Sequence, residues 1–288
     1  MATSTSDKAR HRAEDVCRLL LTAAVIVLPI GSLRAQGKVP YAVTVIRTTF
    51  CGPFIDADST YSAKVTSAVA QMGERGRQAL LWMARGREDD RLCAFHYLSA
   101  LSDERVLPLL RKRVSSRSIS AAELESVIND LSAFRDQRSV GRVLVLTRNA
   151  DPRIAGAAIA YLGVIDTEEV RRYLRSLLQS EDSDKLVRVI GAIGRQQDQQ
   201  AVSSLEELAG KSDVLAYSVA IALGGMLEDP PPESVAVLIR RLPDRETRFR
   251  ATTQIIEDLY AAQNELSVPS RLKSEQRQTF FERLRQGL

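Results

Sequence analysis

The sequence predicts an all-α protein, an α–α superhelical solenoid in which helix pairs stack one after another. Three observations predict it. An apolar pattern recurs at intervals of 30 or 31 residues between residues 92 and 224. Each copy of the pattern follows one face of an α-helix, and each is followed by a turn and a second amphipathic run. A fixed period of this length, with one helix face kept apolar, is typical of stacked helical repeats.

The first helix of each predicted pair ends on a small residue. In the third copy this residue is Gly163, and the positions 1, 4, 5 and 8 before it hold Leu162, Ile159, Ala158 and Ala155. Offsets of 1, 4, 5 and 8 lie on one face of a helix that has 3.6 residues per turn. The same pattern ends at Ser102, Ser132, Gly163, Gly194 and Gly224, and a sixth copy ends at Gly73. Glycine suits this place because it tolerates a left-handed backbone at a helix end.

The second helix of each pair follows a turn that contains an aspartate. The predicted turn aspartates are Asp103, Asp136, Asp166, Asp198 and Asp229. An aspartate there accepts hydrogen bonds from the free N–H groups at the start of a helix, so we interpret these residues as caps and not as catalytic carboxylates. The unit is therefore helix, tight turn, helix.

The repeat resembles the HEAT family, specifically its short variant often called PBS-lyase-like. The clearest match is DPRIAGAAIAYLGVID, residues 151–166, and the resemblance covers residues 62–262. One departure is that Ala155 follows Ile154, where the family often places arginine after valine. The resemblance implies a solenoid that binds proteins. The variant's name refers to chromophore lyases, but the resemblance assigns no lyase residue to this sequence.

The first 35 residues have the composition of a secretory signal peptide. Basic residues from Lys8 to Arg18 precede an apolar stretch, Leu19 to Ile30, and an Ala35–Gln36 junction follows. This order predicts cleavage after Ala35 and an exported protein, periplasmic or extracellular. The alternative is an uncleaved membrane anchor, although a spanning helix needs about 20 apolar residues. Contact with a membrane is expected only if the leader is retained.

The two ends of the solenoid are predicted to be covered, because the end repeats of a stack otherwise expose apolar faces. Residues 36–61 form the predicted N-terminal capping segment, in which Val39 to Thr49 has a strand-like composition rich in Val, Ile and Thr. Residues 263–288 form the predicted C-terminal capping helix, which contains Phe280 and Phe281.

Two cysteines, Cys51 and Cys93, remain after the predicted leader, which takes Cys17 with it. In an oxidising compartment such a pair indicates a disulfide, here joining the N-terminal cap to the first full repeat. The alternative is that Cys93 is a small core residue, since Ile154 and Leu215 fill its position in other copies.

Motifs for catalysis or cofactor binding are not found in the sequence. It contains no HExxH, GxSxG, phosphate loop or dinucleotide fingerprint, and His96 is the one histidine after the leader. Cys51, Cys93 and His96 would make only three zinc ligands, whereas structural zinc sites have four. We therefore expect a protein that is not an enzyme and that holds no cofactor or metal.

The charge of the chain indicates a protein partner more than a nucleic acid. Removal of the leader leaves 35 basic and 33 acidic residues, a net charge of +2. Arginines recur on the predicted second helices, which usually line the concave face of such solenoids. We expect Arg142, Arg171 and Arg175 to contact the partner.

Two classes of function remain open. The first is an exported non-enzymatic scaffold or adaptor that binds a protein of unknown identity on its concave face, with an anionic polymer as the second kind of ligand. The alternative is an enzyme or enzyme accessory related to lyase-type HEAT-repeat proteins.

Overall fold

The computed structural model describes residues 38–49, 51, 66–226, 232–264 and 282. The chain divides into two compact units, Met1–Tyr41 and Ala42–Leu288, and the stacked helices belong to the second. The predicted signal peptide and the aromatic pair Phe280 and Phe281 lie outside the described residues, so those two predictions stay predictions. In this part of the chain no helix is both long enough and apolar enough to cross a membrane.

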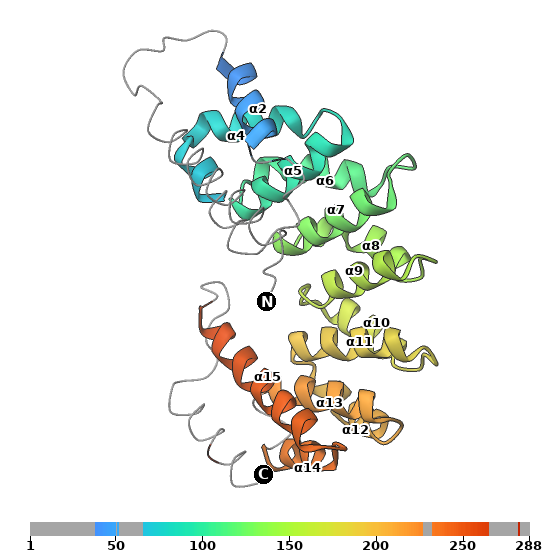
Figure 1. Cartoon of the computed structure of the whole chain (residues 1–288). Coiled ribbons are helices and arrows are strands. Elements are labelled where there is room, and N and C mark those ends of the chain that lie inside the picture. Colours follow the sequence, from blue (N-terminus) through green and yellow to red (C-terminus); the bar gives the residue numbers. More distant parts are fainter. Residues whose placement is uncertain (1–37, 50, 52–65, 227–231, 265–281, 283–288) are drawn as a thin grey trace, which may run out of the picture. The chain divides into compact units, whose positions relative to one another are not determined.

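The described helices follow one another in pairs (Figure 1). After α4 (Gly73–Met83), the pairs are α5 (Glu88–Ala100) with α6 (Leu107–Val114), α7 (Ala121–Ala133) with α8 (Val140–Leu146), α9 (Pro152–Leu162) with α10 (Glu168–Leu177), α11 (Ser183–Gln196) with α12 (Val202–Ala209), and α13 (Asp213–Gly225) with α14 (Pro232–Arg241). The long helix α15 (Arg245–Asn264) packs on α13 and α14. The predicted all-α solenoid fold is confirmed.

Short 3-10 turns lead into three of the second helices. They are η1 (Glu104–Val106) before α6, η2 (Gln137–Ser139) before α8 and η3 (Gln199–Ala201) before α12. The first helices α7, α9, α11 and α13 each pack on the second helix of the preceding pair and on the neighbouring first helices. The repeats therefore share one continuous core, which no single pair is able to bury alone.

The apolar pattern read from the sequence is the core of the stack. Leu131, Leu162, Ile193 and Leu223, each one residue before the small residue, are all fully buried. In the first copy the equivalent Leu101 is only half-buried. The helical periodicity of apolar residues thus located the buried face correctly.

Glycine at the end of the first helices serves close packing, and the left-handed role expected for it is wrong at Gly163. Gly163 has φ −62°, in the right-handed region. A Cβ atom on Gly163 would lie 2.9 Å from Cα of Ala192, and one on Gly194 would lie 2.9 Å from Cα of Ala222. The missing side chain lets neighbouring first helices approach at these points. The left-handed backbone expected for these small residues is found at Gly73 and Ser102, and Arg135 and Gln197 are also left-handed.

The strand expected for Val39–Thr49 is also wrong, because Lys38–Thr49 forms helix α2. Ala42, Val43 and Ile46 are buried. Their spacing of 1 and 4 positions places them on one face of a helix. Strand propensity is weak beside such packing, and it needs a partner strand. The described residues contain no strand for this segment to pair with.

Candidate functional site

Three of the turn aspartates are buried and bind an arginine from the preceding repeat. Nη1 of Arg77 on α4 lies 3.3 Å from Asp103, and Nη1 of Arg175 on α10 lies 2.8 Å from both carboxylate oxygens of Asp198. Arg111 on α6 binds Asp136 in the same way, with its Nε 3.1 Å from Oδ1. Each bond joins the second helix of one pair to the turn of the next. Charged residues of types usually found on surfaces therefore connect consecutive helix pairs.

The aspartates keep the capping role at two of these turns. Asp103 accepts a hydrogen bond from the backbone N–H of Arg105, and Asp198 accepts one from that of Gln200, both at 3.2 Å. The interpretation as caps is confirmed there. The Asp136 side chain makes no capping bond and accepts one from Ser139 Oγ at 2.7 Å instead. At the next turn Thr167, and not Asp166, caps the second helix. Asp229 lies outside the described residues.

Hydrogen bonds from the arginines set the ionisation of the buried carboxyl groups. The side chain of Arg105 holds the pKa of Asp103 at about 2, and burial opposes this shift without reversing it. For Asp136, burial alone would raise the pKa, but hydrogen bonds from Arg111 and Ser139 outweigh burial and lower it. Both aspartates are therefore anions at neutral pH, which is the form that binds arginine most strongly.

The arginine–aspartate connection is missing between α8 and α10. Leu144 directly follows the buried Val143 on α8, as Arg111 follows the buried Leu110 and Arg175 follows the buried Leu174 on their helices. Asp166 accordingly has 61% of its side chain exposed and binds Arg171 from its own repeat. The hydroxyl groups of Thr147 on α8 and Tyr173 on α10 meet at this junction. α8 thus differs in this contact from α4, α6 and α10.

The three arginines predicted to contact a partner have different surroundings. Arg142 is exposed, and its Nε donates a hydrogen bond to the backbone oxygen of Val114 at 3.0 Å. Arg171 is half-buried against Asp166. Arg175 is only 19% exposed and also binds Glu168 at 2.7 Å. Arg175 is therefore part of the structural framework, because its charge neutralises the buried Asp198. The partner contacts expected of the three arginines stay predictions.

Comparison with known proteins identifies the repeat. Residues 141–224, which run from α8 through α13, match the family model described as HEAT repeats. Residues 141–224 are HEAT repeats. The matched stretch lies inside the range of residues 62–262 over which the sequence resembles that family.

Two solved structures resemble the chain more distantly. The complex of CpcE and CpcF of phycocyanin lyase from Nostoc sp. PCC7120 is 12% identical, with a TM-score of 0.48, and the match covers 90% of this chain and 97% of that one. Human deoxyhypusine hydroxylase in complex with glycerol is 17% identical, with a TM-score of 0.32, over 87% of this chain and 91% of that one. These scores are too low for either likeness to carry an argument. No curated protein matches the sequence.

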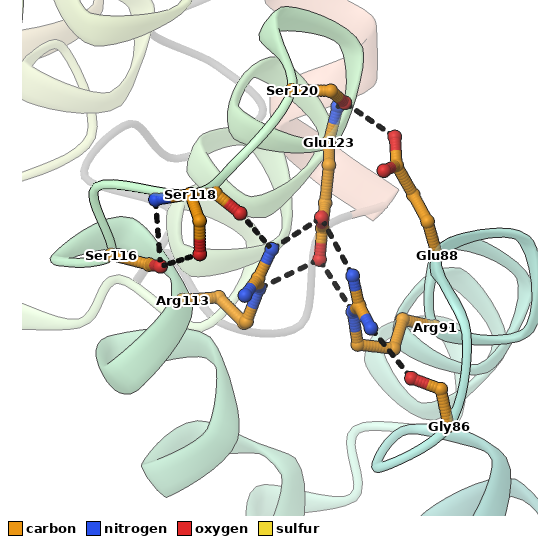
Figure 2. A network of polar contacts seen from close by, with 8 residues as sticks. All are labelled: Gly86, Glu88, Arg91, Arg113, Ser116, Ser118, Ser120 and Glu123. Carbon is orange, nitrogen blue, oxygen red and sulfur yellow. Dashed lines mark hydrogen bonds and ion pairs between the residues drawn. The ribbon is translucent and has the colours of Figure 1, made fainter.

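A second polar network, centred on Glu123, connects two consecutive helix pairs near the N-terminal end of the stack (Figure 2). The Glu123 side chain is fully buried and accepts hydrogen bonds from Nε of Arg91 on α5 at 2.7 Å and from Nε of Arg113 on α6 at 2.8 Å. Burial alone would raise the pKa of Glu123, but hydrogen bonds from the two arginines outweigh burial and lower it. Glu123 is thus a buried anion shared by two consecutive repeats.

The role of Glu123 was not predicted from the sequence, although one local signal for it exists. Ser120 accepts a hydrogen bond from the backbone N–H of Glu123 at 3.1 Å, so the two residues have the spacing of a capping box. That motif predicts a glutamate turned back toward its own helix start. The bonds to Arg91 and Arg113 come from residues 32 and 10 positions away, and no local pattern predicts them.

Helix α2 is fastened to α5 by a disulfide and an ion pair. The structure joins Cys51 to Cys93, with their Cα atoms 5.6 Å apart. Arg47 binds Asp90 through two hydrogen bonds of 2.8 and 2.6 Å. The disulfide is the pairing that the sequence left open against a core role for Cys93. Cys93 is also fully buried, so both properties belong to one residue.

Asp130 on α7 is a buried acid without a basic partner among the described ion pairs. Burial raises the pKa of its carboxyl group to about 7, and the hydroxyl groups of Ser99 and Ser126 lower it only in part. No hydrogen bond of ordinary geometry reaches its Oδ2. Among the described residues, no group of three or more His, Cys, Asp or Glu side chains is arranged to hold a metal ion.

Proposed function

We propose that this protein is an exported, non-enzymatic HEAT-repeat scaffold that binds another protein on the face formed by its second helices. The observation that carries the proposal is that some basic residues of the second helices are structural, whereas others are exposed. Arginines such as Arg111 and Arg175 neutralise buried carboxylates and hold the repeats together, whereas Arg142 and Lys112 on the same row of helices are exposed. The exposed residues are available to a ligand without loss of the fold.

Two features support export. The first 35 residues have the order of a secretory signal peptide. The Cys51–Cys93 disulfide is of the kind that forms and persists in oxidising compartments outside the cytosol. Together they favour a periplasmic or extracellular location, with membrane contact only if the leader is retained.

Protein fractionation with N-terminal sequencing tests the export half of the proposal. We expect the mature chain to begin at or near Gln36 and to be found outside the cytoplasm. A chain that keeps Met1 and remains in the cytoplasmic fraction would contradict it.

Reconstitution tests the binding half of the proposal. Proteins that co-purify with the exported chain are produced separately and mixed with it, and the mass of any complex is measured by light scattering. We expect a complex of defined stoichiometry. A bound chromophore, or turnover of a small molecule by the purified chain, would instead support the enzyme or enzyme-accessory function.

A further inference from the structure

Helix α8 and its leading turn carry positive charge without any acid. Residues 137–148 contain Arg138, Arg142 and Arg148 and no Asp or Glu. Every other described second helix, taken with its leading turn, contains at least one glutamate. These glutamates are Glu74 with α4, Glu104 with α6, Glu168 and Glu169 on α10, Glu206 and Glu207 on α12, and Glu233 on α14. α6 with its leading turn, residues 104–115, has the same net charge, because its four basic residues are offset by one glutamate, whereas the charge of α8 is reached without an acid.

The three arginines of α8 are exposed, and no described ion pair includes them. All three lie in the exposed class of side chains. The one described side-chain hydrogen bond among them joins Nε of Arg142 to the backbone oxygen of Val114, which is a neutral acceptor. By contrast, Arg111, Arg113, Arg171 and Arg175 on the flanking helices all bind carboxylates. No ion pair among the described residues neutralises the charge of these three arginines.

An apolar side chain lies among these charges. Val145 is 63% exposed and stands three positions after Arg142 and three before Arg148. Arg142 and Val145 lie three positions apart on α8 and so share one side of the helix, with Arg138 on η2 before them and Arg148 in the turn after α8. We call these four residues the α8 patch.

The neighbouring second helices extend the positive charge of the α8 patch. Lys112 on α6 and Arg172 on α10 are exposed and belong to no described ion pair. α8 contacts both neighbours, through Arg142 to Val114 and through Thr147 to Tyr173. The same junction is where Leu144 replaces the arginine that would bind a turn aspartate.

We infer that the α8 patch is the docking site of the protein partner, and that the partner presents an acidic segment with an aliphatic side chain between its carboxylates. Carboxylates match the planar guanidinium groups of Arg138, Arg142 and Arg148, with which they form paired hydrogen bonds. The aliphatic side chain covers Val145, as the apolar centre of a protein interface does inside its polar rim. A uniformly charged polymer has no group to place on Val145. This inference rests on the proposed scaffold function and names the partner's chemistry.

A labelled synthetic peptide, with a leucine pair flanked on both sides by glutamates, tests the charged part of the inference. Its affinity is measured by fluorescence anisotropy on the mature chain and on a variant with Arg138→Glu and Arg148→Glu. Arg142 is left unchanged because it also bonds to α6. We expect the affinity to fall by about tenfold, because attraction at two exposed sites becomes repulsion. The matched control, Arg240→Glu with Arg241→Glu on α14, makes the same charge change on exposed residues and should leave affinity within about twofold at physiological salt.

A second pair of variants tests the apolar part. Val145→Ser should weaken peptide binding by about threefold, through the loss of apolar contact area. Val214→Ser is the matched control, because Val214 is 62% exposed but lies on the first helix α13. Polyglutamate without leucine and anionic phospholipid vesicles are measured beside the peptide. Tighter binding of either one than of the peptide would replace the protein segment with an anionic polymer or a membrane surface.

The remaining outcomes separate this inference from the function on which it rests. No binding of the peptide to the mature chain, or equal loss in the α8 and α14 reversal variants, overturns the α8 patch as the site. If a reconstituted protein partner still binds the α8 reversal variant with unchanged affinity, the scaffold function stands and the partner docks elsewhere. If no protein partner forms a complex but the peptide binds at α8, the patch stands and the scaffold function fails. Melting curves of all variants check that they are folded.

Discussion

Arg175 and Asp198 belong to consecutive repeats, and Nη1 of the arginine lies 2.8 Å from each oxygen of the carboxylate. The Asp198 side chain is only 2% exposed, and it is bound by Arg175 and by the backbone N–H of Gln200. A buried carboxylate that loses its cation is left uncompensated in a medium that solvates charge poorly. The pair is therefore a structural connection between two helix pairs, although both residues are of types usually found on surfaces.

Replacement of this arginine should destabilise the stack. Arg175→Ala is expected to lower the free energy of unfolding by about 2 kcal/mol, because Asp198 is then buried without its cation. Arg172→Ala, on the same helix, removes an exposed arginine outside the described ion pairs. It should change the free energy of unfolding by less than about 0.5 kcal/mol. Urea unfolding followed by circular dichroism measures both. Equal stability of the two variants would contradict a structural role for Arg175.

Two glycines of α11 should respond to alanine in opposite directions. Gly194→Ala places a Cβ atom 2.9 Å from both Cα and Cβ of Ala222, and such overpacking costs about 1–3 kcal/mol. Gly191→Ala meets no atom within 4 Å and should stabilise the protein by about 0.5–1 kcal/mol, because alanine favours a helix more than glycine does. Thermal unfolding distinguishes them. A stabilised Gly194→Ala protein would show that the first helices do not approach closely there.

The raised pKa of Asp130 predicts a specific dependence of stability on pH. The carboxyl group titrates at about 7 in the folded protein and at an ordinary value of 3.8 when unfolded, so the folded state holds more protons between these values. Stability therefore falls as pH rises from about 4 to about 7. Asp130→Asn removes this fall, and at pH above about 7 the variant should be more stable than the wild type by on the order of 2 kcal/mol.

The difference in stability between wild type and Asp130→Asn isolates the contribution of Asp130. His96 acts in the same pH range with opposite sign, because burial lowers its pKa, but it is present in both proteins and cancels in their difference. Asp103, with its pKa lowered to about 2, should behave in the reverse way. Its contribution is present above about pH 4 and is lost as pH falls toward 2. Parallel stability curves for wild type and Asp130→Asn from pH 4 to 8 would refute the shift.

The disulfide should be detectable both chemically and thermodynamically. Thiol titration of the denatured, unreduced mature chain should find no free thiol, and a chain that retains its leader should show only that of Cys17. The cross-link restricts the conformations that the unfolded chain can adopt. Reduction is therefore expected to lower the free energy of unfolding by about 3–4 kcal/mol for a separation of 42 residues. The Cys51→Ala, Cys93→Ala variant should be insensitive to reductant, and the same loss in it would assign the effect elsewhere.

The sequence by itself determined the repeat, its core and two of its caps. Apolar residues such as Leu162 and Ile193 recur with the helical period, and burial follows that period because a helix in a stack has one inward face. Asp103 and Asp198 accept hydrogen bonds from N–H groups two residues away, so their capping role can be predicted from the local sequence. The sequence also placed Arg142 on the exposed surface of a second helix.

Only the tertiary structure decided the roles that depend on residues far along the chain. Val39–Thr49 is strand-like in composition, yet it is helical because Ala42, Val43 and Ile46 pack as one helical face. Arg175 is structural and Arg142 is exposed, although both are arginines on second helices, because only Arg175 meets a buried carboxylate, 23 residues onward. The energy of burying or pairing a charge depends on what surrounds it in space, and local periodicity carries no information about those surroundings.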